Sequence, residues 1–130
     1  MTQDGGHDDG APGIGRLAGI TIDCPDPAAL AGFYRALTGW AVSYATDDLV
    51  VLGDGPIRLG LQRVPDHRRP SWPGPDKQLH LDFSVPELDE AEERVLALGG
   101  TRPEFQPGDG SFRVYMDPAG HPFCLSTFGA

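Results

Sequence analysis

The sequence contains two copies of one pattern, 61 positions apart, and this repeat limits the possible folds more than any other feature. When the chain is shifted by that distance, Pro25 falls on Pro86, and many apolar, acidic and glycine positions coincide. The other matched pairs are Asp26 with Glu87, Ala36 with Ala97, Leu37 with Leu98, Gly39 with Gly100, Ile20 with Leu81, and Ile22 with Phe83. A duplicated unit predicts two similar half-domains packed against each other.

Each copy predicts one strand, one helix and three further strands. In the first copy, apolar alternation predicts strands at 17–24, 40–44, 49–52 and 57–64. Asp26 followed by Pro27 is typical of a helix start, and Gly39 of a helix end. The second copy predicts a helix at 87–98 and strands at 79–85, 101–106, 112–116 and 122–128. We therefore expect an α+β fold in which two βαβββ repeats form a curved, half-barrel mixed sheet with the helices outside.

The chain of 130 residues is the size of a single domain. Residues 1–15 are rich in glycine and aspartate, so we expect a disordered tail before a domain at 16–130. Repeat one occupies 16–64, a proline-rich linker 65–78, and repeat two 79–128. The linker carries Trp72, which fits either a solvated connector or the rim of a cavity or a dimer contact.

Charge and composition exclude several partners. The net charge of −9 argues against nucleic acid and anionic membrane surfaces. No apolar run approaches the roughly 20 residues of a membrane span. The chain has two cysteines and begins without the features of a secretion signal, so we expect a cytoplasmic protein with reduced thiols.

The strand predicted at 79–85 carries the strongest candidate site. Its apolar residues Leu79, Leu81, Phe83 and Val85 alternate with polar residues, so His80 and Asp82 share one face with Ser84. A carboxylate beside an imidazole can orient it and raise its pKa. His80 and Asp82 are therefore candidates for an acid–base pair or a ligand-reading pair. A polar pair without a function is an equally good interpretation.

The repeat also relates positions in the two halves. Gly19 corresponds to His80, and with one further residue of slip Gln62 corresponds to Cys124. We expect these four positions to face a common centre. Arg58, Arg113 and Tyr115 are further candidates for reaching a cavity, although the inward face of the 112–116 strand stays open.

Three motifs together resemble the vicinal oxygen chelate superfamily, which includes glyoxalase I, bleomycin-resistance proteins and extradiol dioxygenases. The stretch from Phe33-Tyr34 to Gly39-Trp40 resembles the helix motif of that superfamily. The turn at 117–122 resembles its DPxGxP motif, and residues 77–82 resemble a strand of small bacterial glyoxalase-like proteins. The resemblance implies the duplicated fold described above and a homodimer.

Metal-dependent members of the superfamily place ligands on the first and last strand of each repeat. By resemblance those positions are Gly19, Gln62, His80 and Cys124. Only His80 is a strong ligand, and none of the four is a carboxylate, so we expect no standard catalytic metal or other cofactor. A divalent ion with help from Asp23 or Asp82 is the alternative.

Three functions follow as hypotheses. The first is sequestration of a small organic molecule, of the bleomycin-resistance type. The second is a metal-independent lyase, isomerase or cyclase that uses His80 and Asp82, and the third is a metal-dependent lyase or dioxygenase. The residues expected to contact the ligand are Thr21, Asp23, Arg58, Gln62, Trp72, His80, Cys124 and Ser126.

Overall fold

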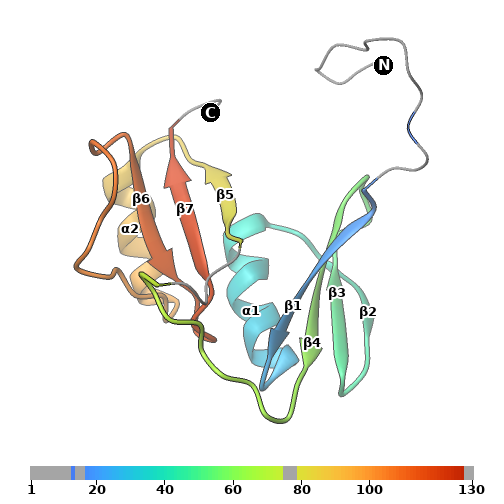
Figure 1. The fold of residues 1–130 in the computed structure, drawn as a ribbon. Coiled ribbons are helices and arrows are strands. Elements are labelled where there is room, and N and C mark those ends of the chain that lie inside the picture. The colour runs from blue at the N-terminus through green and yellow to red at the C-terminus, as the bar shows by residue number, and fades with distance from the viewer. Residues whose placement is uncertain (1–12, 14–16, 75–78, 128–130) are drawn as a thin grey trace.

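The computed structural model describes residues 13, 17–74 and 79–127, which form two mixed β-sheets and two helices (Figure 1). The predicted tail, apart from residue 13, and residues 75–78 of the predicted linker lie outside the described residues. In the described part of the chain, neither helix has the length and apolar character needed to cross a membrane.

The first repeat contains a helix and a four-stranded sheet. Its elements are β1 (Gly19–Cys24), α1 (Pro27–Thr38), β2 (Val42–Ala45), β3 (Leu49–Leu52) and β4 (Arg58–Arg63). The strand order is β1-β4-β3-β2, with β1 parallel to β4 and the other pairs antiparallel.

The second repeat has the same topology with one strand fewer. Its elements are β5 (Leu81–Ser84), α2 (Leu88–Ala97), β6 (Phe112–Met116) and β7 (Pro122–Ser126). The order is β5-β7-β6, and β5 is parallel to β7 as β1 is to β4. The predicted α+β fold of two tandem repeats is confirmed, and the two sheets do not close into a barrel.

The prediction of a strand at 101–106 is wrong. In the described residues this segment contributes only an isolated antiparallel bridge between Thr101 and Met116. Pro103 interrupts the ladder because proline has no N–H to donate. The side chain of Gln106 takes the place of a strand partner: it accepts from the N–H of Val114 at 2.8 Å and donates to its carbonyl at 2.9 Å.

The helix starts preserve the repeat spacing. Asp26 caps α1 by accepting a hydrogen bond from the N–H of Ala29 at 3.3 Å. Glu87, 61 positions later, caps α2 by accepting from the N–H groups of Asp89 and Glu90. These side chains satisfy donors that the first turn of a helix leaves without partners.

The strand register corrects the predicted equivalence of Gln62 and Cys124. Thr21 pairs with Gly60 on β4, whereas Asp82, the equivalent of Thr21, pairs with Cys124 on β7. Cys124 therefore corresponds to Gly60, and Gln62 corresponds to Ser126. The error arises because the paired residues are 39 positions apart in the first repeat and 42 in the second.

Helix α1 joins the two repeats into one core. It lies between the two sheets in Figure 1, and the rings of Phe33 and Tyr34 pack on Phe123 with centroids 5.8 and 6.5 Å away. Tyr34 also donates a 2.6 Å hydrogen bond to the buried carboxylate of Asp117. These contacts connect residues more than 80 positions apart.

Two apolar side chains at the ends of strands differ in burial. Cys24 is fully buried in the core, and burial raises the pKa of its thiol to about 11. Leu79 is one of the apolar residues of the strand predicted at 79–85, but it lies before β5 and is 67% exposed. The strand is shorter than predicted, so its packed face begins at Leu81.

Candidate ligand-binding site

The face of the second sheet that points away from α2 brings three reactive side chains together. His80 lies immediately before β5, and its Nε2 atom is 3.3 Å from Oδ1 of Asp82. Asp82 pairs with Cys124 across the parallel ladder, so both side chains emerge on the same face. One side-chain donor atom from each of His80, Asp82 and Cys124 lies within 4.8 Å of the others.

Two grooves meet at His80 and Asp82. The first has a volume of about 380 Å³ and runs along the second sheet to Cys124, with walls formed by Trp72, Phe112 and Val114. The second, of about 340 Å³, lies between β5 and the first sheet and is lined by Trp40, Ile57 and Arg58 as well. Each volume falls within the range typical of small-molecule sites.

The structure settles which face of β6 points toward the grooves. Phe112 and Val114 line the first groove, whereas Arg113 and Tyr115 point toward α2. Tyr115 donates a 2.7 Å hydrogen bond to Glu92. Burial, and to a smaller extent this bond, raises the pKa of Tyr115 to about 12. Arg113 and Tyr115 therefore do not take the cavity role that was considered for them.

The other predicted contact residues lie in different places. Arg58 and Trp72 line the grooves, and the ring of Trp72 also packs on Phe105 at 5.7 Å. Ser126 lines a neighbouring hollow that also reaches Asp82. The remaining predicted residues are on the first sheet: Thr21 and Asp23 line a separate hollow, and Gln62 is exposed on β4.

A four-ligand metal centre of the kind found in the superfamily does not fit this chain. The first-repeat equivalents of His80 and Cys124 are Gly19 and Gly60, which have no side-chain donor. A Cβ at Gly60 would lie 3.1 Å from Oγ1 of Thr21, so this position is closely packed by its neighbour. His80, Asp82 and Cys124 remain as a set of donors from one repeat only.

Several groove residues escape prediction from the sequence. In the sequence Trp40 stands out only as the end of the motif that contains α1, but it is 39% exposed and lines the groove beside Arg58. Phe112 and Val114 alternate with Arg113 and Tyr115, so the pattern defines two faces without indicating which is inward. His121, which lines the separate hollow with Thr21 and Asp23, sits in the turn before β7, where its sequence context indicates only a turn.

Residues 19–126 match the family model of the glyoxalase-like domain. Because this match covers most of the chain, the protein belongs to that family and so to the vicinal oxygen chelate superfamily. No curated protein matches the chain.

Solved structures show the same fold. A glyoxalase-related enzyme from Fulvimarina pelagi is 25% identical, with a TM-score of 0.63 over 85% of this chain and 86% of that chain. A glyoxalase/bleomycin resistance protein/dioxygenase family enzyme from Burkholderia phytofirmans PsJN is 18% identical, with a TM-score of 0.67 over 85% and 97%. A fosfomycin resistance protein from Listeria monocytogenes, solved with Mn(II) and 1S,2S-dihydroxypropylphosphonic acid, is 18% identical, with a TM-score of 0.68 over 88% and 93%.

Proposed function

We propose that the protein binds a small organic molecule in the two joined grooves beside β5, without a four-ligand metal centre. The observation that carries this proposal is the position of His80 and Asp82, which line both grooves. A site with apolar walls and a few convergent polar groups is the usual form of a small-molecule site.

The walls of the grooves favour one class of ligand. Trp40, Trp72 and Phe112 offer flat apolar surface on both sides of the His80–Asp82 pair. A ligand with a planar apolar part and one polar group fits this arrangement, with the polar group next to His80. The net charge of −9 disfavours a strongly anionic ligand.

The test is a thermal-shift screen of planar heterocyclic compounds on protein dialysed against a chelator. A compound present at 100 times its Kd stabilises the folded state by about 2.7 kcal/mol. We expect His80→Ala and Asp82→Asn to remove the shift, and the control Asp48→Asn, at an exposed loop position, to keep it. Hits that stabilise all three variants equally would overturn the assignment of the site.

A metal-independent acid–base enzyme is the second candidate. The 3.3 Å approach of His80 Nε2 to Asp82 Oδ1 favours it, because a carboxylate can orient an imidazole for proton transfer. With a bound compound in hand, conversion is measured at concentrations high enough to saturate each protein, and His80→Ala should then still abolish it. If the wild-type protein leaves every bound compound unchanged, the sequestering function is the better account.

A soft divalent ion held by His80, Asp82 and Cys124 is the third candidate, favoured by the closeness of their donor atoms. Zinc is measured after purification without added metal, in wild-type protein and in Cys124→Ser. Stoichiometric zinc in the wild type that falls in the variant would replace the metal-free proposal. Zinc well below stoichiometry in both would eliminate this candidate.

A homodimer completes the proposal. Support comes from apolar side chains exposed on and beside the edge strand β2: Val42 is 42% exposed and Tyr44 54% exposed. Light scattering after size exclusion should give twice the chain mass, and Tyr44→Glu should shift the protein toward monomer. A monomeric wild-type protein at all concentrations would contradict the dimer.

A further inference from the structure

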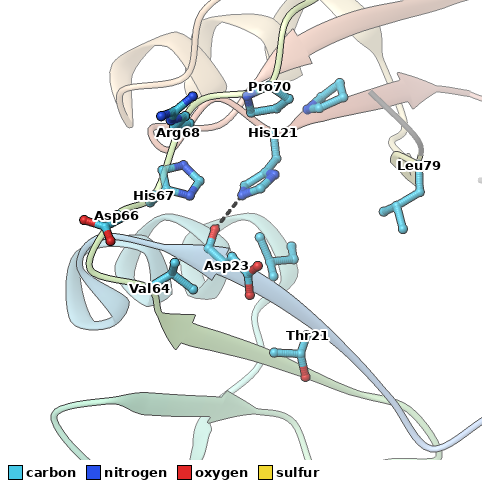
Figure 2. Close-up of a pocket in the computed structure, with 11 residues that line it drawn as sticks. Thr21, Asp23, Val64, Asp66, His67, Arg68, Pro70, Leu79 and His121 are labelled. Atoms are coloured by element: carbon cyan, nitrogen blue, oxygen red, sulfur yellow. Dashed lines mark hydrogen bonds between the residues drawn. The ribbon is translucent and has the colours of Figure 1, made fainter. Parts of the chain in front are cut away.

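A second hollow lies where the two repeats meet, away from the His80–Asp82 pair. It has a volume of about 390 Å³ and is bounded by β1, by residues 64–70 after β4 and by the turn before β7 (Figure 2). His67 from the linker and His121 from the turn lie side by side in it, with ring centroids 5.4 Å apart. Figure 2 shows the ring of His121 directed at Asp23, with the ring of His67 beside it.

The hydrogen bonds of the two histidines fix their tautomers. Nε2 of His121 lies 2.6 Å from the backbone carbonyl oxygen of Asp23, and Nε2 of His67 lies 3.0 Å from that of Ala119. A carbonyl oxygen can only accept, so each Nε2 must carry the proton and donate. In the neutral form an imidazole has a single N–H, so in that form each Nδ1 atom presents a lone pair that accepts a hydrogen bond.

The turn that holds His121 is rigidly built. Oδ1 of the buried Asp117 accepts from the N–H groups of Ala119 and His121 at 2.8 and 3.0 Å, while Oδ2 accepts from Tyr34. The linker is tied to the same turn, because Arg69 donates a 2.9 Å hydrogen bond to the carbonyl of Pro118. The walls of the hollow are therefore positioned before any ligand arrives, which reduces the cost of binding.

The polar groups of the hollow call for a ligand that donates hydrogen bonds. The lining contains the two imidazole Nδ1 acceptors and also the carboxylates of Asp23 and Asp66. It contains one cation as well, Arg68. A single metal ion is a poor fit: in the described residues, the His, Cys, Asp and Glu groups close enough for three ligands are those of His80, Asp82 and Cys124. A guanidinium or ammonium group on a short chain reaches more widely spaced acceptors.

We propose that this hollow is a second ligand site, specific for a small organic cation with N–H donors, such as an alkylguanidinium or alkylammonium. The cation donates to Nδ1 of His67 and His121, and the carboxylates of Asp23 and Asp66 supply its charge partners. The site shares Pro122 with the first groove but not His80 or Asp82, so it stands independently of the proposed function.

The test uses imidazole ¹⁵N resonances of the full chain at pH 8, with agmatine as the cationic probe and butyrate as the anionic control. We expect His67 and His121 to show the Nε2–H tautomer, and agmatine to shift their Nδ1 resonances while leaving those of His80 in place. Protonated Nδ1 atoms, equal shifts by butyrate, or no response to agmatine would each overturn the proposal.

Two pairs of substitutions separate recognition from structure. A glutamine places an amide N–H close to the position of histidine Nε2 but lacks the Nδ1 acceptor. The double variant His67→Gln/His121→Gln should therefore keep the melting temperature of the wild type. It should bind agmatine at least about tenfold more weakly, a loss of about 1.4 kcal/mol. His67→Asn/His121→Asn loses the Nε2 donors and should melt earlier. Agmatine binding unchanged in the glutamine variant would show that the histidines only hold the turn.

Discussion

At the scale of single residues, the buried carboxylate of Asp117 connects the two repeats. It is 1% exposed and receives hydrogen bonds from Tyr34, Ala119 and His121. A buried carboxylate is tolerated when donors surround it, so each of these bonds matters for stability. The same residue positions the turn that carries His121, which links the core to the second hollow.

Replacing Tyr34 tests this connection. Tyr34→Phe removes the 2.6 Å hydrogen bond to a buried carboxylate and should reduce the free energy of unfolding by about 1.5–3 kcal/mol. Urea denaturation measures the loss. Equal stability of Tyr34→Phe and the wild type would show that Asp117 does not depend on this donor.

Glu92 gives the protein a defined response to acid. Burial alone would raise its pKa, but the hydrogen bond from Tyr115 and the charges of Arg102 and Arg113 hold that pKa below the usual glutamate value of about 4.3. When the pKa of a carboxyl group is lower in the folded state, its ionised form stabilises the fold at pH values above the pKa of the unfolded state. This stabilisation is lost as the pH falls through the pKa of the folded state.

The stability difference between wild type and Glu92→Gln should therefore be largest near neutral pH. It should shrink as the pH falls below about 4.3, when the wild-type carboxylate takes up its proton. Urea midpoints between pH 3 and pH 7 measure this, and Glu93→Gln on the exposed side of α2 serves as the control. A difference that does not vary with pH would contradict the role of the ionised carboxylate.

Sequence periodicity predicts some site residues and misses others for a physical reason. His80 and Asp82 were expected together because alternate residues of an extended chain share a face, and the structure places them 3.3 Å apart. His121 depends instead on a turn folded by Asp117 and on the approach of β1 to that turn. Such a contact joins residues 98 positions apart and leaves no local pattern.

At the scale of secondary-structure elements, local signals define the helices better than the strands. The start of α1 at Asp26 was identified because capping involves neighbouring residues, and the second helix was predicted to begin at Glu87, which the structure shows to be its cap. The ends of a strand depend on its partner strand, so they cannot be found from neighbouring residues alone. The segment at 101–106, for example, forms only one bridge. Here a side chain, that of Gln106, provides the pairing that a backbone strand was expected to provide.

Gly32 within α1 and Gly39 just after it should respond in opposite directions to the same change. Gly32 lies within the helix with no atom within 4 Å of an added Cβ, so Gly32→Ala should stabilise the protein by about 0.5–1 kcal/mol. Gly39 ends the helix with φ +76°, so Gly39→Ala should destabilise it by about 1 kcal/mol. Thermal and urea unfolding measure both, and effects of the same sign would contradict the helix end placed at Gly39.

At the scale of the whole molecule, the two repeats have the same topology but different chemistry. The second repeat carries His80 and Cys124 at positions where the first has Gly19 and Gly60. The duplicated fold was predictable because caps and apolar periods repeat in the sequence. The chemical difference became clear only with the strand register, which depends on the lengths of the loops within each repeat.

The most direct test of the central proposal is ligand binding by metal-free protein. A stabilising compound from the screen is titrated by calorimetry into chelator-treated wild-type protein, with and without added zinc, and into His80→Ala. We predict the same Kd with and without zinc, and a Kd at least about tenfold higher in His80→Ala, equivalent to about 1.4 kcal/mol. Binding that requires zinc, or that is unchanged by the loss of His80, would contradict a metal-independent site in these grooves.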